Sequence, residues 1–361
     1  MSEGEAAKPG EGEAEPDEPS RPAWVGWLFT LAKLGLAAAL LGWILSKDEF
    51  DWSKLGGALT SRYMVMVALL ATVGLSMSGV RWQFLLRAEG IRVGLWTAVK
   101  LTWIGHFWNM VIPGAVSGDA VKMYYIGQVA PERREEAWTT VLADRAIGLC
   151  ALVGVAAVAS LLRFEFMWQR TELRLLLLTM IFVLACFLVG GLVIMTGLGR
   201  EWALTAWAAQ RLPEKLRGLI GRVYGSLHRT ARNPKTVAAT LAISVLAHSI
   251  AVANAYLLGQ ALEEKVLSFS QYATAVPVAL FSNAIPLTPG GGVGVGEAVI
   301  GKLFEWFGGS SGKGGMVMLA YRVNFFLLAG VGAALYAFYR SHDPRLQNLE
   351  EGLGEAETPQ A

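Results

Sequence analysis

FWNMVIPGAVSGDAV at 107–121 and FSNAIPLTPGGGVGVGEAV at 281–299 break two long apolar stretches, 94–128 and 268–308, with Pro and Gly. Each stretch is too long for one helix, and Pro and Gly in such number end helices. In a bilayer the freed backbone groups must face protein or a wet cavity, because lipid cannot hydrogen-bond them. We therefore expect two broken, re-entrant hairpins buried in a helix bundle; the alternative is a surface loop between two full spans.

The composition around these breaks is that of a membrane protein. Apolar residues make up 54% of the 361 positions and charged residues only 17%, whereas soluble domains carry about 25% charged residues. The sequence predicts an all-α polytopic membrane protein with about six full spans and two re-entrant hairpins. Apolar runs of the length that a bilayer needs lie at 25–45, 63–80, 138–162, 173–197, 236–260 and 315–339.

Other features argue against several classes of function. The tails, 1–23 and 341–361, are rich in Glu, Pro and Gly and are expected to be disordered. The net charge of +2 offers no basic domain for nucleic acid. The four His and two Cys are scattered, so we expect no metal site and no disulfide framework. No G-x4-G-K-[ST] motif occurs, and no cofactor and no catalytic residue are predicted.

Positive charge predicts the orientation in the cell membrane. Segment 198–235 carries eight Lys and Arg against two Glu, and segment 81–92 carries three Arg against one Glu. Both segments, and therefore both termini, are expected in the cytoplasm, while loops 46–62 and 163–172 are expected outside. The first hairpin then enters from the cytoplasm and the second from outside. Segment 198–235 also alternates apolar and basic residues, a pattern that suits interfacial helices on an anionic leaflet. The alternative is a plain cytoplasmic connector with solvated charges.

The two broken stretches also match each other, which indicates an internal repeat. Asp119 lies 26 residues before Arg145, and Glu297 lies 25 residues before Arg322. Copies at 24–162 and 173–340 would each hold three full crossings, and an odd number of crossings inverts the second copy. Inverted repeats with broken helices are a recurring plan of transporters; chance similarity of two Gly/Pro breaks is the alternative. The matching residues are Phe107, Asn109, Pro113, Gly118, Asp119, Ala120 and Val121 with Phe281, Asn283, Pro286, Gly296, Glu297, Ala298 and Val299.

These motifs resemble those of a known family. N-x3-P-G-x3-G-D at 109–119, D-R at 144–145, P-L-T-P-G-G-x-G-x-G-E at 286–297 (with one extra Gly here) and Arg322 resemble the membrane region of lysylphosphatidylglycerol synthases, whose stand-alone relatives are called flippase-like proteins. The resemblance covers about residues 25–340. It implies that the membrane region moves an aminoacylated lipid, which a separate soluble domain makes in bifunctional members. This chain ends at residue 361, so the resemblance implies the transport half without lysyl transfer, and no enzyme is expected.

Charged residues within apolar runs are the candidate site, because a charge at membrane depth costs about 2.5–3.5 kcal/mol on insertion scales. The Arg fork suits a lipid phosphate, and half-helices that begin near 117–119 and 294–297 would point backbone N–H groups at an anion. Asp144, beside Arg145, is a further charge of this kind. The predicted substrate-binding residues are Arg145, Arg322, Asp119, Glu297, Asn109, Asn283, Pro113, Gly118, Pro289, Gly290, Gly294 and Gly296.

Each of these residues also has a structural interpretation. The acids could hold the arginines when no lipid is bound, meet the amine of a cationic headgroup, or be protonated during transport. Asp119 could instead cap its helix or pair with Lys122, Glu297 could be a favourable acid at a helix start, and the Arg–acid pairs could only lock helices. The asparagines could be local caps. His106 and His248 are expected to be packing residues, and Lys100 to snorkel or line a cavity.

Three functions remain open from the sequence. The first is a transporter or flippase that moves a phospholipid or lipid-linked molecule between leaflets, with a membrane lipid as its partner. The second is an intramembrane transferase, whose carboxylates would be acid–base groups. The third is a membrane subunit that anchors a separate synthase through segment 198–235.

Overall fold

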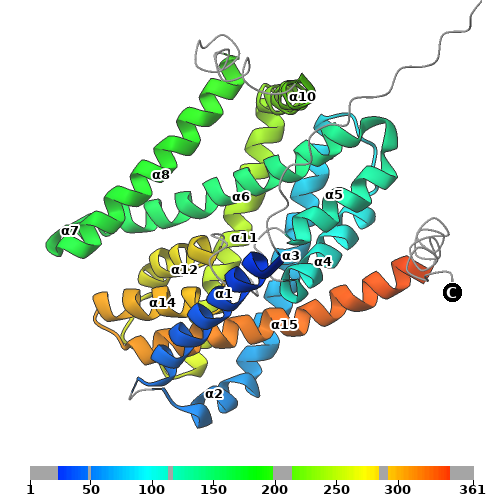
Figure 1. The fold of residues 1–361 in the computed structure, drawn as a ribbon. Coiled ribbons are helices and arrows are strands. Elements are labelled where there is room, and N and C mark those ends of the chain that lie inside the picture. Colours follow the sequence, from blue (N-terminus) through cyan, green and yellow to red (C-terminus); the bar gives the residue numbers. More distant parts are fainter. Residues whose placement is uncertain (1–22, 48–49, 113–116, 198–213, 284–291, 342–361) are drawn as a thin grey trace, which may run out of the picture.

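The computed structural model describes residues 23–47, 50–112, 117–197, 214–283 and 292–341, and the regular elements in these ranges are helices (Figure 1). The predicted tails lie almost wholly outside them. The helices are α1 (Ala23–Leu45), α2 (Trp52–Leu59), α3 (Arg62–Ala88), α4 (Leu95–Val111), α5 (Ser117–Val129), η1 (Pro131–Arg133), α6 (Arg134–Leu161), α7 (Phe164–Gln169), α8 (Thr171–Thr196), α10 (Glu214–Ala231), α11 (Pro234–Ala261), α12 (Phe269–Asn283), α14 (Val295–Trp306) and α15 (Ser311–Ser341).

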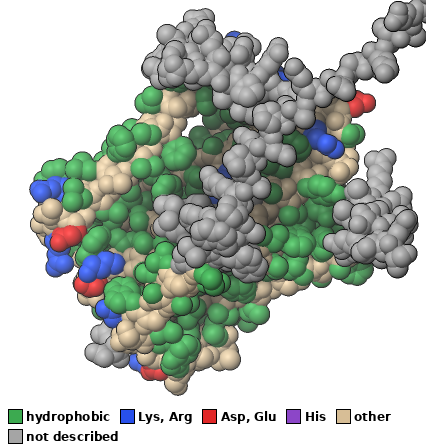
Figure 2. Space-filling view, viewed as in Figure 1, with side chains coloured by type: hydrophobic (Ala, Val, Ile, Leu, Met, Phe, Trp, Pro, Cys, Tyr) green, Lys and Arg blue, Asp and Glu red, His purple; other side chains and the backbone are tan. Residues whose placement is uncertain are grey.

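Five of these helices, α3, α6, α8, α11 and α15, are long and apolar enough to cross a membrane. Helix α1 coincides with the sixth predicted span, 25–45, and has a shorter apolar part, Leu34–Leu45. The surface is apolar as well. Figure 2 shows hydrophobic side chains over most of one face, with charged side chains gathered toward its edges. Water would not tolerate so much contiguous apolar surface, so the prediction of an all-α polytopic membrane protein is confirmed.

Loops from distant parts of the chain meet at two opposite ends of the bundle. We call one of them the α2 end. There Lys54 pairs with Glu263 (Nζ to Oε2, 3.8 Å), and Lys313 Nζ donates to the Glu263 carbonyl (3.0 Å). At the other, the α10 end, Arg229 pairs with Glu89 (NH2 to Oε2, 2.9 Å). The segments predicted to share a side, 81–92 with 198–235, therefore meet. Which end faces the cytoplasm stays a prediction.

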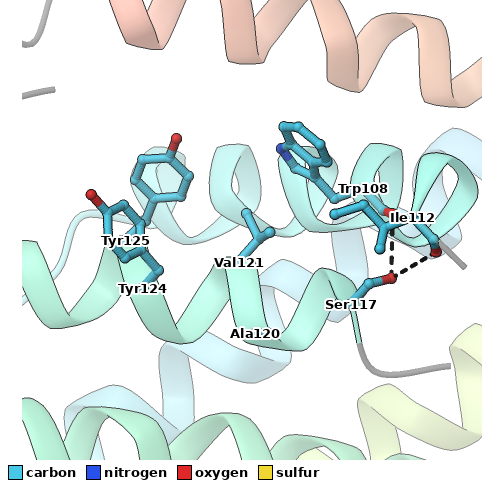
Figure 3. Close-up of a pocket in the computed structure, with 7 residues that line it drawn as sticks. All are labelled: Trp108, Ile112, Ser117, Ala120, Val121, Tyr124 and Tyr125. Carbon is cyan, nitrogen blue, oxygen red and sulfur yellow. Dashed lines mark hydrogen bonds between the residues drawn. The ribbon is translucent and has the colours of Figure 1, made fainter. Parts of the chain in front are cut away.

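Both broken stretches form helical hairpins. In the first, α4 and α5 pack antiparallel, so that Gly105 lies against Lys122 and Asn109 against Gly118. Ser117 Oγ donates to the carbonyls of Trp108 (3.3 Å) and Ile112 (3.2 Å) across the break (Figure 3). Helix α5 has 13 residues, and a helix of that length is about 20 Å long, too short for a hydrocarbon core of about 30 Å.

The second hairpin, α12 with α14, is inserted from the opposite end. The loop after α11 leads into α12 at the α2 end, and Gln271 Nε2 donates to the Phe307 carbonyl (3.3 Å), which holds the two legs together there. The legs α4 and α5 of the first hairpin instead open at the α10 end, next to Glu89 and Arg133. Insertion from opposite ends agrees with the predicted entry of the two hairpins from opposite sides.

The end of the second predicted span was wrong. Helix α3 continues to Ala88, so Arg81 lies inside a helix and not in a loop at 81–92. The helix can continue because the buried Arg81 guanidinium is neutralised by Asp144 (Nε to Oδ1, 2.6 Å). The predicted loops 46–62 and 163–172 also contain the short helices α2 and α7.

Equivalent helices of the two halves run in opposite directions. Helices α3 and α11 each precede a broken hairpin, and they pack antiparallel: Gly74 lies against Ile250, and Arg81 NH1 donates to Ser244 Oγ (3.0 Å). The halves also make equivalent contacts with each other: α6 of the first half packs on α12 of the second, and α15 of the second half packs on α4 of the first. These relations are those of an inverted repeat. Its predicted limits, 24–162 and 173–340, stay predictions.

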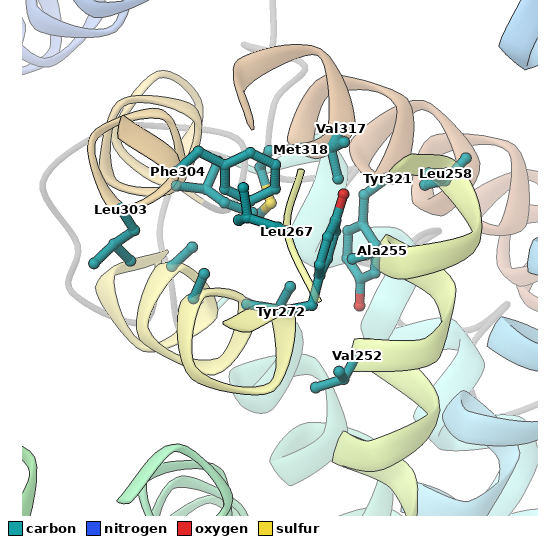
Figure 4. Close-up of a cluster of buried hydrophobic side chains, with 14 of the residues drawn as sticks. Val252, Ala255, Leu258, Leu267, Tyr272, Leu303, Phe304, Val317, Met318 and Tyr321 are labelled. Atoms are coloured by element: carbon teal, nitrogen blue, oxygen red, sulfur yellow. The ribbon is translucent and has the colours of Figure 1, made fainter. Parts of the chain in front are cut away.

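The larger apolar core holds the second hairpin against the spans around it (Figure 4). Tyr272 of α12 meets Phe304 of α14 edge-to-face, with ring centroids 5.1 Å apart. Its hydroxyl donates to Glu264 Oε2 (3.1 Å), so the buried phenol is satisfied. Leu258 of α11 and Val317 of α15 close this core. The hairpin is therefore a packed part of the bundle.

Helix α1 is seated on the second half by glycines, which gives a first prediction. Ile44 lies between Gly301 and Gly315, and a Cβ added to Gly315 would overlap the Ile44 side chain. We expect Gly315→Leu to lower the free energy of unfolding by about 1–3 kcal/mol, the usual cost of overpacking. Gly330→Leu is the matched control on the same helix, where an added Cβ meets nothing within 4 Å. Thermal unfolding in detergent measures both, and equal losses would contradict the proposed seat.

Candidate functional site

The first predicted ion pair is formed at the tip of the first hairpin. Helix α5 begins at Ser117, which places Asp119 in its first turn. Arg145 lies near the middle of α6, and its NH1 donates to Asp119 Oδ2. The Arg145 and Asp119 side chains are 28% and 17% exposed, so the pair is partly exposed.

The second predicted pair is sealed. Arg322 of α15 meets Glu297 of α14 through two hydrogen bonds, Nε to Oε1 (2.5 Å) and NH2 to Oε2 (3.2 Å). Arg322 NH2 also donates to the Gly292 carbonyl (3.1 Å). The Arg322 and Glu297 side chains are 7% and 0% exposed. Two parallel charge-assisted hydrogen bonds make this the stronger kind of pair.

The glycines of the second break are needed for this geometry. Gly292 and Gly294 have φ values of +84° and +85°, which L side chains rarely adopt. The turn that they make lets Glu297 Oε2 accept the Gly294 N–H (2.8 Å). Glu297 therefore closes the start of its own helix as well as holding Arg322. The interpretation of Glu297 as an acid at a helix start is correct, and it is compatible with the pair.

Each predicted asparagine lies against the equivalent glycine of its hairpin. Asn109 Oδ1 accepts the Gly118 N–H (2.7 Å), so Asn109 caps α5, as one interpretation predicted. In the second hairpin a Cβ on Gly296 would lie 2.5 Å from Asn283 Oδ1. The breaks differ in length, yet Asn and Gly meet in both. The predicted residues Pro113, Pro289 and Gly290 lie outside the described residues.

A third charged cluster lies beside the first pair and was not predicted as a unit. Asp144 accepts from Arg81 and pairs with Lys122 (Nζ to Oδ2, 3.5 Å), and the three side chains are 7–9% exposed. Lys122 Nζ also lies over the Trp82 ring, 4.2 Å from its centroid. The sequence does contain evidence for this cluster. Arg81 follows the apolar run 63–80 and apolar residues continue beyond it, just as Arg145 lies within the run 138–162. A span that ends before its first charge, at residue 80, excludes Arg81, although α3 continues to Ala88.

Neighbouring residues on α6 divide the charges between the two clusters. Asp144 and Arg145 are adjacent and point to different faces, as predicted: one toward Arg81, the other toward Asp119. The alternative pairing of Asp119 with Lys122 is wrong, because Lys122 turns to Asp144.

The other polar residues near the hairpins are packed. His106 Nε2 donates to the Phe325 carbonyl (3.0 Å) and His248 Nε2 to the Gly148 carbonyl (2.9 Å). Both are packing residues, as predicted. Lys100 Nζ lies 4.7 Å from the centroid of the Tyr339 ring, so its charge is held at the α10 end of the bundle.

The three clusters together carry a net positive charge, which lies in the Arg81–Asp144–Lys122 cluster. They hold four cations against three carboxylates, which leaves one positive charge in excess. At both tips the arginine fork is held by a carboxylate, a group whose geometry a phosphate oxygen pair can replace. At the partly exposed Arg145–Asp119 pair, an external anion can therefore take the place of the carboxylate without leaving the arginine unpaired.

Comparison with known proteins assigns the chain to a family. The family described as the lysylphosphatidylglycerol synthase TM region matches residues 30–332. A UPF0104 membrane protein of Methanothermobacter thermautotrophicus is 21% identical over 295 residues, which cover 77% of this chain and 86% of the relative. A second UPF0104 membrane protein, of Pyrococcus horikoshii, is 23% identical over 264 residues, 67% of this chain and 76% of the relative. The chain is therefore a multi-pass membrane protein that belongs to the lysylphosphatidylglycerol synthase TM-region family.

Proposed function

We propose that this protein binds the phosphate of a phospholipid or lipid-linked molecule at its hairpin tips and moves that headgroup between the leaflets. The observation that carries the proposal is the pair of Arg–carboxylate contacts at two hairpin tips inserted from opposite ends of the bundle. Family membership supports it, because the resemblance already implied a membrane region that moves a modified lipid.

The position of the tips supports a re-entrant arrangement. Arg145 and Arg322 lie well inside α6 and α15, helices of 28 and 31 residues. A tip beside the middle of a spanning helix lies at membrane depth, where an ionisable residue is expensive and usually functional. Each hairpin would then carry its arginine toward the midplane from a different leaflet, the plan of transporters built from inverted repeats.

The two pairs differ in access, which supports movement by alternation. The Arg145–Asp119 pair is partly exposed and the Arg322–Glu297 pair is sealed. In the proposed cycle a headgroup first exchanges with Asp119 at Arg145. The second pair opens when the first closes, and the phosphate is released toward the other leaflet.

The experiment is leaflet exchange in liposomes for wild type and Arg145→Ala. Purified protein is reconstituted with head-group-labelled anionic, zwitterionic and aminoacylated lipids, and a quencher that cannot cross the membrane reports exchange. A hydrogen bond to a charged group contributes about 1.5–3 kcal/mol, so we expect Arg145→Ala to slow exchange by about tenfold to hundredfold. The matched control is Arg222→Ala, which removes an exposed Arg–Glu pair with Glu135 and should leave exchange unchanged.

Two results would overturn the proposal. One is wild-type protein that accelerates exchange of none of the lipid classes under an ion gradient or a membrane potential. The other is equal exchange by wild type and Arg145→Ala. Turnover of a lipid by the purified protein would favour the transferase alternative. The anchoring alternative is weakened at α10, because Arg222 and Arg229 already pair with Glu135 and Glu89 within the chain.

A further inference from the structure

An apolar groove lies along the outer side of the first hairpin (Figure 3). Its volume is about 390 Å³, within the size range of small-molecule sites. One end reaches Ser117, two residues from Asp119, and the other reaches the tyrosines of α5. Its lining is Trp108, Ile112, Ser117, Ala120, Val121, Tyr124 and Tyr125.

The second hairpin has a groove in the equivalent place, but helix α1 packs beside it. Ala298 and Val299 line this second groove, and they follow Glu297 as Ala120 and Val121 follow Asp119. Its other side is formed by Leu40 and Trp43, both on α1. The equivalent face of α14 therefore receives an apolar partner from within the chain.

The residues that seat α1 explain why no helix of the described residues is seated on the first hairpin in the same way. Gly301 and Gly315 admit Ile44 of α1. Aligning Glu297 with Asp119, and Arg322 with Arg145, places Met123 and Trp138 at these two positions of the first half. Trp138 Nε1 donates to the Met123 carbonyl (2.8 Å), so large side chains fill the place where a helix would approach.

The counterpart of α1 is accordingly placed elsewhere. Helix α8 opens the second half as α1 opens the first, and it packs mainly on α6, α7 and α10 (Figure 1). The two ion pairs differ in the same sense: the pair on the hairpin covered by α1 is sealed, and the pair on the other hairpin is partly exposed. Among the described residues, α5 packs mainly on α4 and α6, whereas α14 packs on α12, α15 and α1.

We infer that the groove between α4 and α5 holds one hydrocarbon chain of the transported lipid while its phosphate meets Arg145, so that lipid enters sideways past the first hairpin. This inference rests on the proposed function. An apolar occupant fits because the equivalent face takes an apolar helix and because the lining is almost wholly apolar. A charged headgroup on that occupant fits because the groove reaches Ser117 in the first turn of α5, and the same turn carries Asp119, the partner of Arg145.

The test is photolabelling with phosphatidylglycerol that carries a diazirine on one acyl chain, in phosphatidylcholine vesicles. We expect label to concentrate on peptides of α4 and α5, at Trp108 and Tyr124, and to fall when unlabelled phosphatidylglycerol is added. Ala120→Trp fills the groove and should reduce both this label and lipid exchange by about tenfold, as expected for loss of about 1.4 kcal/mol of binding. Ala185→Trp, on the exposed surface of α8, is the matched control and should change neither.

The outcomes separate the groove from the transport function, because labelling needs no transport. Label spread evenly over the exposed helices, or groove label that does not respond to competitor, overturns the inference even if Ala120→Trp fails to fold. Groove label with no lipid exchange by wild type overturns the proposed function and leaves a chain-binding groove. Lipid exchange that depends on Arg145, with no label in the groove, overturns the chain-binding groove and leaves the proposed function standing.

Discussion

Arg322→Ala is expected to lower the free energy of unfolding by about 3–5 kcal/mol, because it leaves Glu297 buried and unpaired. The Glu297 side chain is 0% exposed, and two of its hydrogen bonds come from Arg322. Thermal unfolding in detergent, followed by Trp fluorescence, measures the loss. The variant should also fail to exchange lipid, but that failure alone would not separate a binding role from a folding role.

The double variant Glu297→Gln/Arg322→Met makes that separation. Replacing both partners of a buried pair by groups of similar size is often neutral for stability, and the amide oxygen of the introduced glutamine could still accept the Gly294 N–H that Glu297 accepts now. We expect the double variant to recover most of the stability and none of the lipid exchange. Recovery of both would show that the pair only locks α14 to α15. The Arg145–Asp119 pair, which is partly exposed, should give a smaller stability loss when Arg145 is removed.

The Arg–acid pairs could be predicted because membrane burial makes a charge conspicuous. An isolated Arg322 in an apolar run needs a partner, and Glu297 was the matching acid of the repeated motif. The same rule would have identified Arg81, had the second span been extended through WQFLL instead of ending at the first charge. An arginine does not end a membrane helix when a carboxylate from another helix neutralises it, as Asp144 neutralises Arg81.

Two features depend on tertiary packing and could not be predicted from the sequence: the seat of α1 and the choice of ion-pair partners. Glycines at 301 and 315 indicate close approach, but only the packed bundle shows that Ile44 of α1 fills the space between them. The pairing of the charged side chains could not be predicted for the same reason. Spacing suggested that Lys122 could meet Asp119, and the rotation of α5 against α6 gave it to Asp144. Local patterns therefore located the hairpins and their charges, whereas the choice among nearby partners depended on helix rotation.

The Arg81–Asp144–Lys122 cluster should respond unequally to loss of its members. Asp144→Asn removes the one carboxylate of the cluster and leaves two cations, 7–8% exposed, with no anion between them. We expect a loss of about 3–5 kcal/mol in the free energy of unfolding, as for other broken buried pairs. Arg81→Met should cost less, because Asp144 keeps Lys122 as its partner and the Met side chain fills the same space.

Thermal unfolding in detergent checks this order, with Glu305→Gln as the control. Glu305 belongs to an exposed pair with Lys302, with side chains 48% and 47% exposed, and an exposed pair of this kind contributes about 0–1 kcal/mol. If Arg81→Met proved as costly as Asp144→Asn, the cluster would depend on the Arg81 contact with Ser244 more than on charge balance. The expected order would instead show that Asp144 joins α3, α5 and α6 at one buried point. The first hairpin would then be anchored by Asp144, which leaves Arg145, one residue further on, able to exchange its carboxylate for a ligand.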